Sequence, residues 1–301
     1  MNAEDCRQLL QCHFPHLKVS TVSPALESMD YAVFCVNERC IFRFAERPDV
    51  RAKLHKEVRL LPELAQTVSI SVPRFEFIYL SQNVSDVEFV GYDKIDGVPL
   101  TPAHMGGQHT PQLAGQLAAL LREIHAFPQQ VALGLAVPHF TAAAWRGYYR
   151  DFFLHIQAEV VRVLDRDTSL QVSQLWNEYL RDDTNFAFVP VLIHGDLVSP
   201  HILANIEGTA IAGIIDWADA AIGDPAFDFA RILTEYGERT TQRILDEYRA
   251  FDEPFLRRMR FYAMAMPFNK IAFGLLHGRE SMVQVGIEHL KARLNRWAGI
   301  L

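Results

Sequence analysis

Two stretches near the middle of the chain decide the fold: IHGDLVSPHIL at residues 193–203 and GIIDWAD at residues 213–219. Each places polar side chains directly after a short apolar run, the pattern of a strand that ends in a turn. Four of these side chains are of types that ligate metal ions or move protons: His194, Asp196, His201 and Asp216. Because turns at strand ends let polar side chains converge, we expect the four to share one site.

The spacing of these residues suits the transfer of a phosphoryl group. Such a reaction needs a group that accepts or orients the proton of the acceptor hydroxyl. It also needs oxygen or nitrogen ligands that hold Mg²⁺ against the phosphates. One short loop and the end of the next hairpin would supply both. The alternative interpretation is a solvated loop that contains a structural hydrogen bond between His and Asp.

Residues on the amino-terminal side of this region predict a β-rich part with one embedded helix. The stretch YAVFCVNERCIFRF at residues 31–44 predicts a hairpin, since two β-rich runs flank the polar residues 37–39. Residues 50–64 show helical spacing of apolar side chains, with Glu57 on the apolar side. Pro62 is expected to end or kink that helix.

The remaining pattern predicts an α+β fold in two lobes. Strands are expected at 74–80 and 87–92, followed by a connector with Gly and Pro at 93–99. We therefore expect a nucleotide-binding lobe at 1–92 and a helical lobe at 100–301 that contains a small β patch. The expected helices are 3–14, 110–126, 141–164, 170–182, 226–251 and 254–299.

The two central stretches resemble the catalytic and metal loops of the aminoglycoside phosphotransferases, relatives of protein kinases. Other segments look like family sequence and stand in family order: YAVFCVNERCIFRF, KEVRLLPEL, VGYDKIDGVPLTP and AIGDPAFDFARI. Together they cover the chain from about residue 20 to about residue 235. KIDGVPLTP and IFRF look most like the branch that phosphorylates the 2″-hydroxyl of aminoglycosides. The resemblance implies a protein-kinase-like fold of a small β-rich lobe and a larger helical lobe.

The resemblance also implies roles for the residues of the two loops. Asp196 matches the catalytic aspartate that accepts the proton of the substrate hydroxyl, with His194 in support. Asp216 matches the aspartate that binds Mg²⁺. His201 stands where protein kinases have asparagine, and it is expected to ligate Mg²⁺ directly or through a water. Imidazole suits Mg²⁺ less well than an amide oxygen does.

Two departures from the family pattern concern the nucleotide, which is expected to be ATP or GTP. Arg43 stands where the family usually has lysine, and it can pair with Glu57 as a planar fork. The loop that should cover the nucleotide, residues 23–32, has no glycine, so hydroxyls such as that of Ser28 would replace backbone donors. The other residues expected to bind the nucleotide are Tyr92, Lys94 and Ile95.

The charge of the chain favours a cationic small-molecule substrate. The sequence has 29 Lys and Arg against 36 Asp and Glu, which gives a formal net charge of −7. No basic stripe is available to neutralise the phosphates of a nucleic acid, so we expect no such partner. An acidic surface instead attracts cations. We expect Asp219, Glu235 and Glu238 to bind the ammonium groups of an aminoglycoside.

We expect a cytoplasmic protein without a membrane anchor. No apolar run approaches the roughly 18 residues that cross a bilayer, and the start of the chain is acidic where a signal peptide would be basic. The four cysteines form no C-x-x-C pair and are expected to be reduced. The sequence leaves the oligomeric state open.

Two alternatives to an aminoglycoside kinase remain at this stage. The acceptor could be a macrolide or a metabolic alcohol such as an amino sugar, which changes the substrate but not the chemistry. The chain could also be a pseudokinase-like module that binds nucleotide without turnover, for which Arg43 and the glycine-free loop are the evidence. Against that second alternative, Asp196 and Asp216 are both present, and a degenerate module has usually lost one of them.

Overall fold

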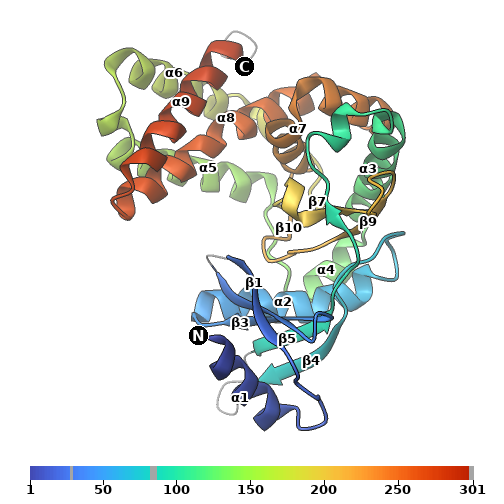
Figure 1. Cartoon of the computed structure of the whole chain (residues 1–301). Helices are drawn as coiled ribbons and strands as arrows, with labels where there is room; N and C mark the ends of the chain where they lie inside the picture. The colour runs from blue at the N-terminus through green and yellow to red at the C-terminus, as the bar shows by residue number, and fades with distance from the viewer. Residues whose placement is uncertain (28–29, 82–86, 298–301) are drawn as a thin grey trace. The chain divides into compact units, whose positions relative to one another are not determined.

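The computed structural model describes residues 1–27, 30–81 and 87–297, and the chain forms two compact units (Figure 1). Unit 1 comprises residues 1–137 and 199–220. Unit 2 comprises residues 138–198 and 221–301. The chain therefore passes from unit 1 to unit 2, returns once for a short segment, and ends in unit 2.

Unit 1 is built around a five-stranded antiparallel sheet with the strand order β1-β2-β3-β5-β4. The strands are β1 (Val22–Glu27), β2 (Tyr31–Val36), β3 (Cys40–Ala45), β4 (Phe75–Leu80) and β5 (Val87–Asp93). The predicted hairpin is confirmed, because β2 pairs with β3 around a turn that contains Asn37 and Glu38 at positive φ. Helix α1 (Ala3–His13) packs through Cys6 and Leu10 on the cluster formed by Phe34, Phe42, Phe44 and Phe89.

Helix α2 (Pro48–Leu64) carries the apolar stripe that its spacing predicts. Val50 and Leu54 are buried in one cluster with Val90 of β5, which holds the helix on the sheet. Pro62 lies inside the last turn, and the helix ends at Leu64. A proline this close to the end removes one hydrogen bond without breaking the preceding turns.

Unit 1 also contains a three-stranded sheet. Its strands come from two separate segments of the chain, and this is why residues 199–220 belong to unit 1. Its strands are β6 (Val98–Pro99), β8 (Ile202–Ala204) and β9 (Ile211–Ile214), in the order β6-β8-β9. Helix α3 (Thr110–His125) packs on β9 and on the short helix η1 (His104–Gly106), and helix α4 (Gln129–Gly134) follows it in the chain. Because β6 pairs with β8, residues after the expected connector stay with the first unit. The lobe boundaries at 92 and 100 remain a prediction, since they describe function rather than packing.

Unit 2 is mostly helical, and its core is aromatic. Its elements are α5 (Ala142–Glu159), η2 (Val161–Val163), α6 (Arg166–Arg181), η3 (Asp183–Phe186), β7 (Val191–Ile193), β10 (Ala221–Gly223), α7 (Ala226–Tyr248), α8 (Glu253–Leu276) and α9 (Glu280–Trp297). Helices α5, α6, α8 and α9 lie side by side (Figure 1). Trp176 of α6 stacks on Phe153 of α5 and meets Phe261 of α8 edge-on. Aromatic side chains therefore fill the space between these helices.

The carboxyl-terminal helical region differs from the expectation of one helix over 254–299. It forms two helices, because α8 ends at Leu276 and α9 begins at Glu280. Gly278 has a φ of 62°, a left-handed conformation that ends helices and that glycine adopts without steric cost. Helix α7 is also irregular, with non-helical backbone angles at Gly237.

The structure confirms the α+β class and the β-rich first part followed by a mostly helical remainder. No helix within the described ranges is both long enough and apolar enough to cross a bilayer. All four cysteines are free thiols, and Cys35 and Cys40 form no bridge across the β2–β3 hairpin.

Candidate active site

The open end of the β8–β9 hairpin brings His201 beside Asp216. Ile202 pairs with Ile214, and the next residue, Ile215, donates its backbone N–H to the carbonyl of His201 at 2.9 Å. His201 and Asp216 are therefore neighbours across the end of the hairpin, with 3.5 Å between Nε2 and Oδ2. The sequence predicted that polar side chains would meet at the ends of short apolar strands, and His201 and Asp216 do so.

Arg43 of β3 joins this hairpin end to helix α2. Its guanidinium forms a two-pronged ion pair with Glu57, with N–O distances of 2.6 and 3.3 Å. The same guanidinium lies 3.5 Å from the carboxylate of Asp216, and its carbon sits 4.0 Å above the ring of Tyr31. The predicted pairing of Arg43 with Glu57 is thus present, and it extends to Asp216.

Burial sets the electrostatics of this group. Glu57 is completely buried and Arg43 nearly so. Burial raises the pKa of Glu57 above its usual range, and the positive charge of Arg43 acts in the opposite direction. Burial alone would lower the pKa of Arg43, but Glu57 and Asp216 outweigh it and raise that pKa. A guanidinium stays protonated at physiological pH, so an ionised pair is the state that this contact stabilises.

In unit 2, helix α7 fixes the loop that contains Asp196. Asp228, buried in the first turn of α7, accepts the backbone N–H groups of His194 at 3.0 Å and of Gly195 at 2.9 Å. The ring Nδ1 of His194 in turn accepts the backbone N–H of Asp196 at 3.2 Å. A buried carboxylate that receives two N–H groups holds a loop in one conformation. Asp228 thus ties the first turn of α7 to the loop that contains Asp196.

Arg231, one helical turn after Asp228, contacts the side chain of Asp196. Its guanidinium forms an ion pair with that carboxylate and also lies 3.4 Å from the carbonyl oxygen of Gly195. Residues three apart on a helix share a face, so Asp228 and Arg231 hold the loop from the same side. Asp196 belongs to unit 2, whereas Asp216, His201, Arg43 and Glu57 belong to unit 1.

The residues expected to contact the nucleotide base lie on β5 and just after it. Tyr92 is buried in β5 opposite Ile41 of β3. Lys94 is exposed, and its backbone N–H donates to the carbonyl of Arg39 at 2.7 Å. The side chain of Ile95 packs against Gly213 of β9, where an added Cβ would lie 2.9 Å from it. Ser28 lies outside the described residues.

Two of the three acidic residues expected to bind substrate already have partners within their own unit. Asp219 pairs with Lys53 at 3.0 Å. Glu238 pairs with Arg296 at 2.7 Å and accepts the indole N–H of Trp297 at 2.8 Å, and these contacts lower its pKa. Glu238 also borders a cavity of about 400 Å³ between α7 and α8, together with Leu233, Arg239 and Met259. Glu235 is half-buried on α7, one turn beyond Arg231.

A family profile described as the phosphotransferase enzyme family matches residues 25–262, most of the chain. The chain belongs to this family. A curated relative from Bacillus subtilis (strain 168), the uncharacterized protein YcbJ, is 25% identical over 218 residues, which cover 69% of this chain and 67% of the relative. Viomycin phosphotransferase from Streptomyces vinaceus is 24% identical over 168 residues, which cover 55% of this chain and 56% of the relative.

A solved structure, the GDP and kanamycin complex of APH(2″)-IIIa, superimposes on nearly the whole chain. Its TM-score is 0.90 at 26% identity, over 97% of this chain and 99% of that one. This likeness supports the 2″ branch to which the KIDGVPLTP and IFRF segments point. The chain is therefore a phosphotransferase with the kinase-like fold that the sequence predicted.

The sequence reasoning missed two residues of this phosphotransferase that contact the predicted site. Arg231 was not singled out, although it follows Asp228 by one helical turn and so shares its face. Lys56 was not singled out either, although it directly precedes Glu57 and is buried in α2. A lysine at a buried helix position is rare enough to draw attention, but the sequence alone does not show that this position is buried.

Proposed function

We propose that this phosphotransferase transfers the γ-phosphoryl group of ATP or GTP to a hydroxyl of an aminoglycoside, the 2″-hydroxyl first. The observation that carries the proposal is the contact of Arg43 with both Glu57 and Asp216. In protein kinases a strand cation that pairs with a helix glutamate and a nearby aspartate that holds Mg²⁺ must both be in place for phosphoryl transfer, and Arg43, Glu57 and Asp216 match these three parts. The likeness to a structure solved with GDP and kanamycin supports the choice of ligands.

In this proposal Asp196 is the catalytic base. Its carboxylate would accept the proton of the substrate hydroxyl as the oxygen attacks the γ-phosphorus, and the nucleoside diphosphate would leave. His194 and Asp228 support it by fixing the loop backbone, and Arg231 holds its carboxylate. A base that is already positioned before substrate binds loses little entropy on the way to the transition state.

Asp216 and His201 fit a magnesium ion that is shared with phosphates. Within the part of the chain that the structure describes, no three His, Cys, Asp or Glu side chains converge closely enough to hold a metal ion by themselves. Mg²⁺ usually takes only one or two carboxylates from a protein and completes its shell with phosphates and waters. Asp216 is partly exposed beside His201, as such a site requires. The ion would neutralise charge on the phosphates.

We propose that the nucleotide lies against β5 and the segment after it, with Tyr92, Lys94 and Ile95 near the base. Arg43 lies beside Asp216, where it would act on the phosphates. Glu57 would hold Arg43 in place. Ser28 remains a proposed phosphate contact. The absence of glycine between residues 23 and 32 leaves fewer close backbone approaches for phosphates.

Among the acidic residues, Glu235 is the best candidate for a cationic substrate. It lies one turn along α7 from Arg231, the residue that contacts Asp196, so both occupy one side of the helix. Asp219 and Glu238 carry ion pairs within their units, and an ammonium group of the substrate would have to compete with Lys53 and Arg296. We therefore give these two a secondary role.

The proposal is tested by measuring nucleoside diphosphate release with ATP and with GTP against aminoglycosides, macrolides and neutral sugars. The account expects Mg²⁺-dependent turnover that an aminoglycoside stimulates strongly. If only macrolides or neutral alcohols were phosphorylated, the proposed aminoglycoside acceptor would be wrong and the proposed phosphoryl transfer would stand. Nucleotide binding with no turnover for any acceptor would support the pseudokinase-like alternative.

A further inference from the structure

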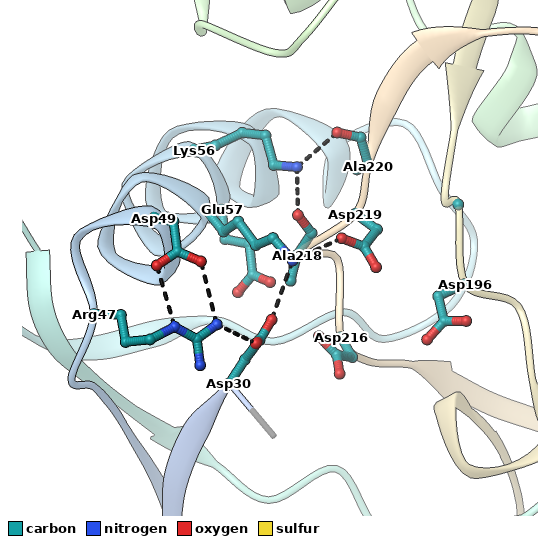
Figure 2. Close-up of polar contacts among 12 residues, drawn as sticks. Asp30, Arg47, Asp49, Lys56, Glu57, Asp196, Asp216, Ala218, Asp219 and Ala220 are labelled. Atoms are coloured by element: carbon teal, nitrogen blue, oxygen red, sulfur yellow. Dashed lines mark hydrogen bonds and ion pairs between the residues drawn. The ribbon is translucent and has the colours of Figure 1, made fainter. Parts of the chain in front are cut away.

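The segment directly after Asp216 is fastened to one face of helix α2. The ammonium group of Lys56 donates hydrogen bonds to the carbonyl oxygens of Ala218 at 2.7 Å and Ala220 at 2.6 Å (Figure 2). One turn earlier on the same helix, Lys53 pairs with the carboxylate of Asp219 at 3.0 Å. Two lysines of α2 thus hold three consecutive residues, 218, 219 and 220.

The two lysines differ in their surroundings. Lys56 is only 6% exposed, whereas the Lys53 side chain is 35% exposed and also pairs with Asp30. Burial of an ammonium group costs free energy unless hydrogen bonds compensate. Burial lowers the pKa of Lys56 to about 8, and Glu57 and Asp219 offset only part of that effect. The carbonyls of Ala218 and Ala220 are the hydrogen-bond acceptors that compensate for this burial.

The backbone at Asp216 is in a conformation that needs support from both sides. Its φ is 63°, in the left-handed region that non-glycine residues seldom adopt. Such a residue persists where its surroundings fix it. On the amino-terminal side, Ile214 and Ile215 donate backbone N–H groups to Ser71 and His201. On the carboxyl-terminal side, Lys56 donates buried hydrogen bonds to Ala218 and Ala220, and the buried indole of Trp217 donates to the carbonyl of Ile214.

We propose that Lys56 is a positioning residue that holds the carboxylate of Asp216 in the orientation for Mg²⁺. The inference rests on the proposed function, because it assigns Lys56 a task in the magnesium site. Two adjacent residues of α2, Lys56 and Glu57, would then both support the magnesium site. Glu57 holds Arg43 by its side chain, and Lys56 holds the main chain that follows Asp216.

The test compares Lys56→Met with Lys53→Met, a matched lysine on the same helix that contacts the same segment. The readout is the Mg²⁺ concentration at half-maximal binding of a fluorescent ATP or GTP analogue, together with binding of the analogue without Mg²⁺. For Lys56→Met we expect the Mg²⁺ requirement to rise about 10- to 100-fold, as when a residue that orients a metal ligand is lost. Without Mg²⁺, the affinity for the analogue should stay within about twofold of the wild-type value. Lys56 supports the metal ligand Asp216 and is not itself a proposed phosphate contact.

For Lys53→Met the requirement should change by less than about threefold, because an exposed ion pair contributes little. Lys56→Arg retains charge and donors, and it should restore most of the Mg²⁺ response. Should Lys56→Met fail to fold, Lys56→Gln takes its place in the same comparison. The inference is overturned if the Lys56 variant keeps the Mg²⁺ requirement of the wild type, or if Lys53→Met shifts it equally.

The two proposals fail in different ways in this experiment. Wild-type protein that binds no nucleotide analogue in the presence of Mg²⁺ contradicts the proposed function. Wild-type protein with a clear Mg²⁺ response, which Lys56→Met leaves unchanged, contradicts only the role of Lys56.

Discussion

Asp196 is held at three points by residues of its own unit. His194 accepts its backbone N–H, Arg231 pairs with its carboxylate, and Asp228 fixes the two preceding amides. Arg231 holds the carboxylate, and the other contacts hold the backbone of the loop. A side chain that is positioned in this way suits the proposed role of a general base.

Replacing Asp196 by asparagine should abolish most turnover and leave the fold intact. Asparagine has nearly the same shape but cannot accept a proton, and loss of a general base typically costs about 10²- to 10⁴-fold in kcat. Steady-state kinetics with the best acceptor, alongside nucleotide binding, measures both effects. A variant that keeps near-normal kcat would remove Asp196 from the mechanism.

Arg43 and Glu57 should behave as one unit. Removing one partner of a buried ion pair leaves an uncompensated charge, which typically costs about 3–5 kcal/mol. We expect Glu57→Leu to lower the free energy of unfolding by an amount of that order, and Arg43→Met with Glu57→Leu together to cost much less than the sum of the two single changes. Denaturant unfolding of the four proteins forms the cycle. Additive costs would mean that the contact is energetically unimportant.

The lowered pKa of Lys56 gives stability a distinct pH dependence. In the folded state this pKa is about 8, whereas in an unfolded chain a lysine titrates near 10.4. Between these two pH values the unfolded state binds more protons than the folded state, so the free energy of unfolding should rise with pH. Measured against Lys56→Met, the total rise should be up to about 3 kcal/mol. Glu57, Asp219 and Asp216 raise the pKa and Lys53 lowers it. A wild-type-minus-variant difference that stays flat from pH 8 to pH 10.5 would contradict this.

Helix α7 organises the loop that contains Asp196. Its first turn begins at Ala226 and carries Asp228, and the next turn carries Arg231. Asp224, just before the helix, is buried against Arg258 at 2.6 Å and Tyr262 at 2.7 Å, which ties the start of α7 to α8. The loop with Asp196 thus rests on a helix that is itself anchored by a buried ion pair.

We expect Asp228→Asn to loosen this loop. An amide oxygen can replace one carboxylate oxygen but leaves one of the two buried N–H groups of His194 and Gly195 without its acceptor. An unsatisfied buried polar group costs about 1–3 kcal/mol, so the unfolding free energy should fall by that amount and kcat should fall with it. Thermal unfolding and kinetics on the same preparation check both. Unchanged stability would show that the loop does not depend on this carboxylate.

Local pattern predicted the elements whose signals are contained within a few residues. The β2–β3 hairpin, the stripe of α2 and the strand-turn-strand around His201 and Asp216 all follow from side chains close in sequence. The loop predicted over residues 23–32 is wrong for its first part, which belongs to strand β1. Ser23 and Pro24 give no β signal, and the strand forms only through its pairing with β2. The division between α8 and α9 depends on the backbone angle at Gly278, which sequence spacing does not reveal.

The sequence predicted which residues form the candidate site, but it did not predict most of the contacts between them. Resemblance indicated Asp196, Asp216, Arg43 and Glu57, and the structure shows the contact of Arg43 with Glu57 and Asp216. Arg231 and Lys56 could not be found, because their partners are more than thirty residues away in sequence. The charges of Asp219 and Glu238 were read as available to a substrate, and their partners come from elements distant in sequence.

The net charge of the whole chain, −7, favours a cationic ligand. We expect Glu235→Gln to raise the KM for an aminoglycoside about two- to fivefold, because a charge pair that stays in contact with solvent contributes up to about 1 kcal/mol. The effect should shrink as salt concentration rises, and the nucleotide KM should hardly change. Glu238→Gln is the matched control on the same helix, and its smaller effect follows from its pairing with Arg296. Equal effects of the two variants, or none at any salt concentration, would contradict this assignment.

The mass of the acceptor after incubation with the enzyme tests the proposed phosphoryl transfer directly. Kanamycin, Mg²⁺ and either ATP or GTP are mixed with the wild-type chain or with Asp196→Asn, and the antibiotic is analysed by mass spectrometry. The account predicts kanamycin that carries one added phosphoryl group with wild-type protein, and almost none with the variant. Unmodified kanamycin and other aminoglycosides after prolonged incubation with both nucleotides, or equal product from the Asn variant, would contradict it.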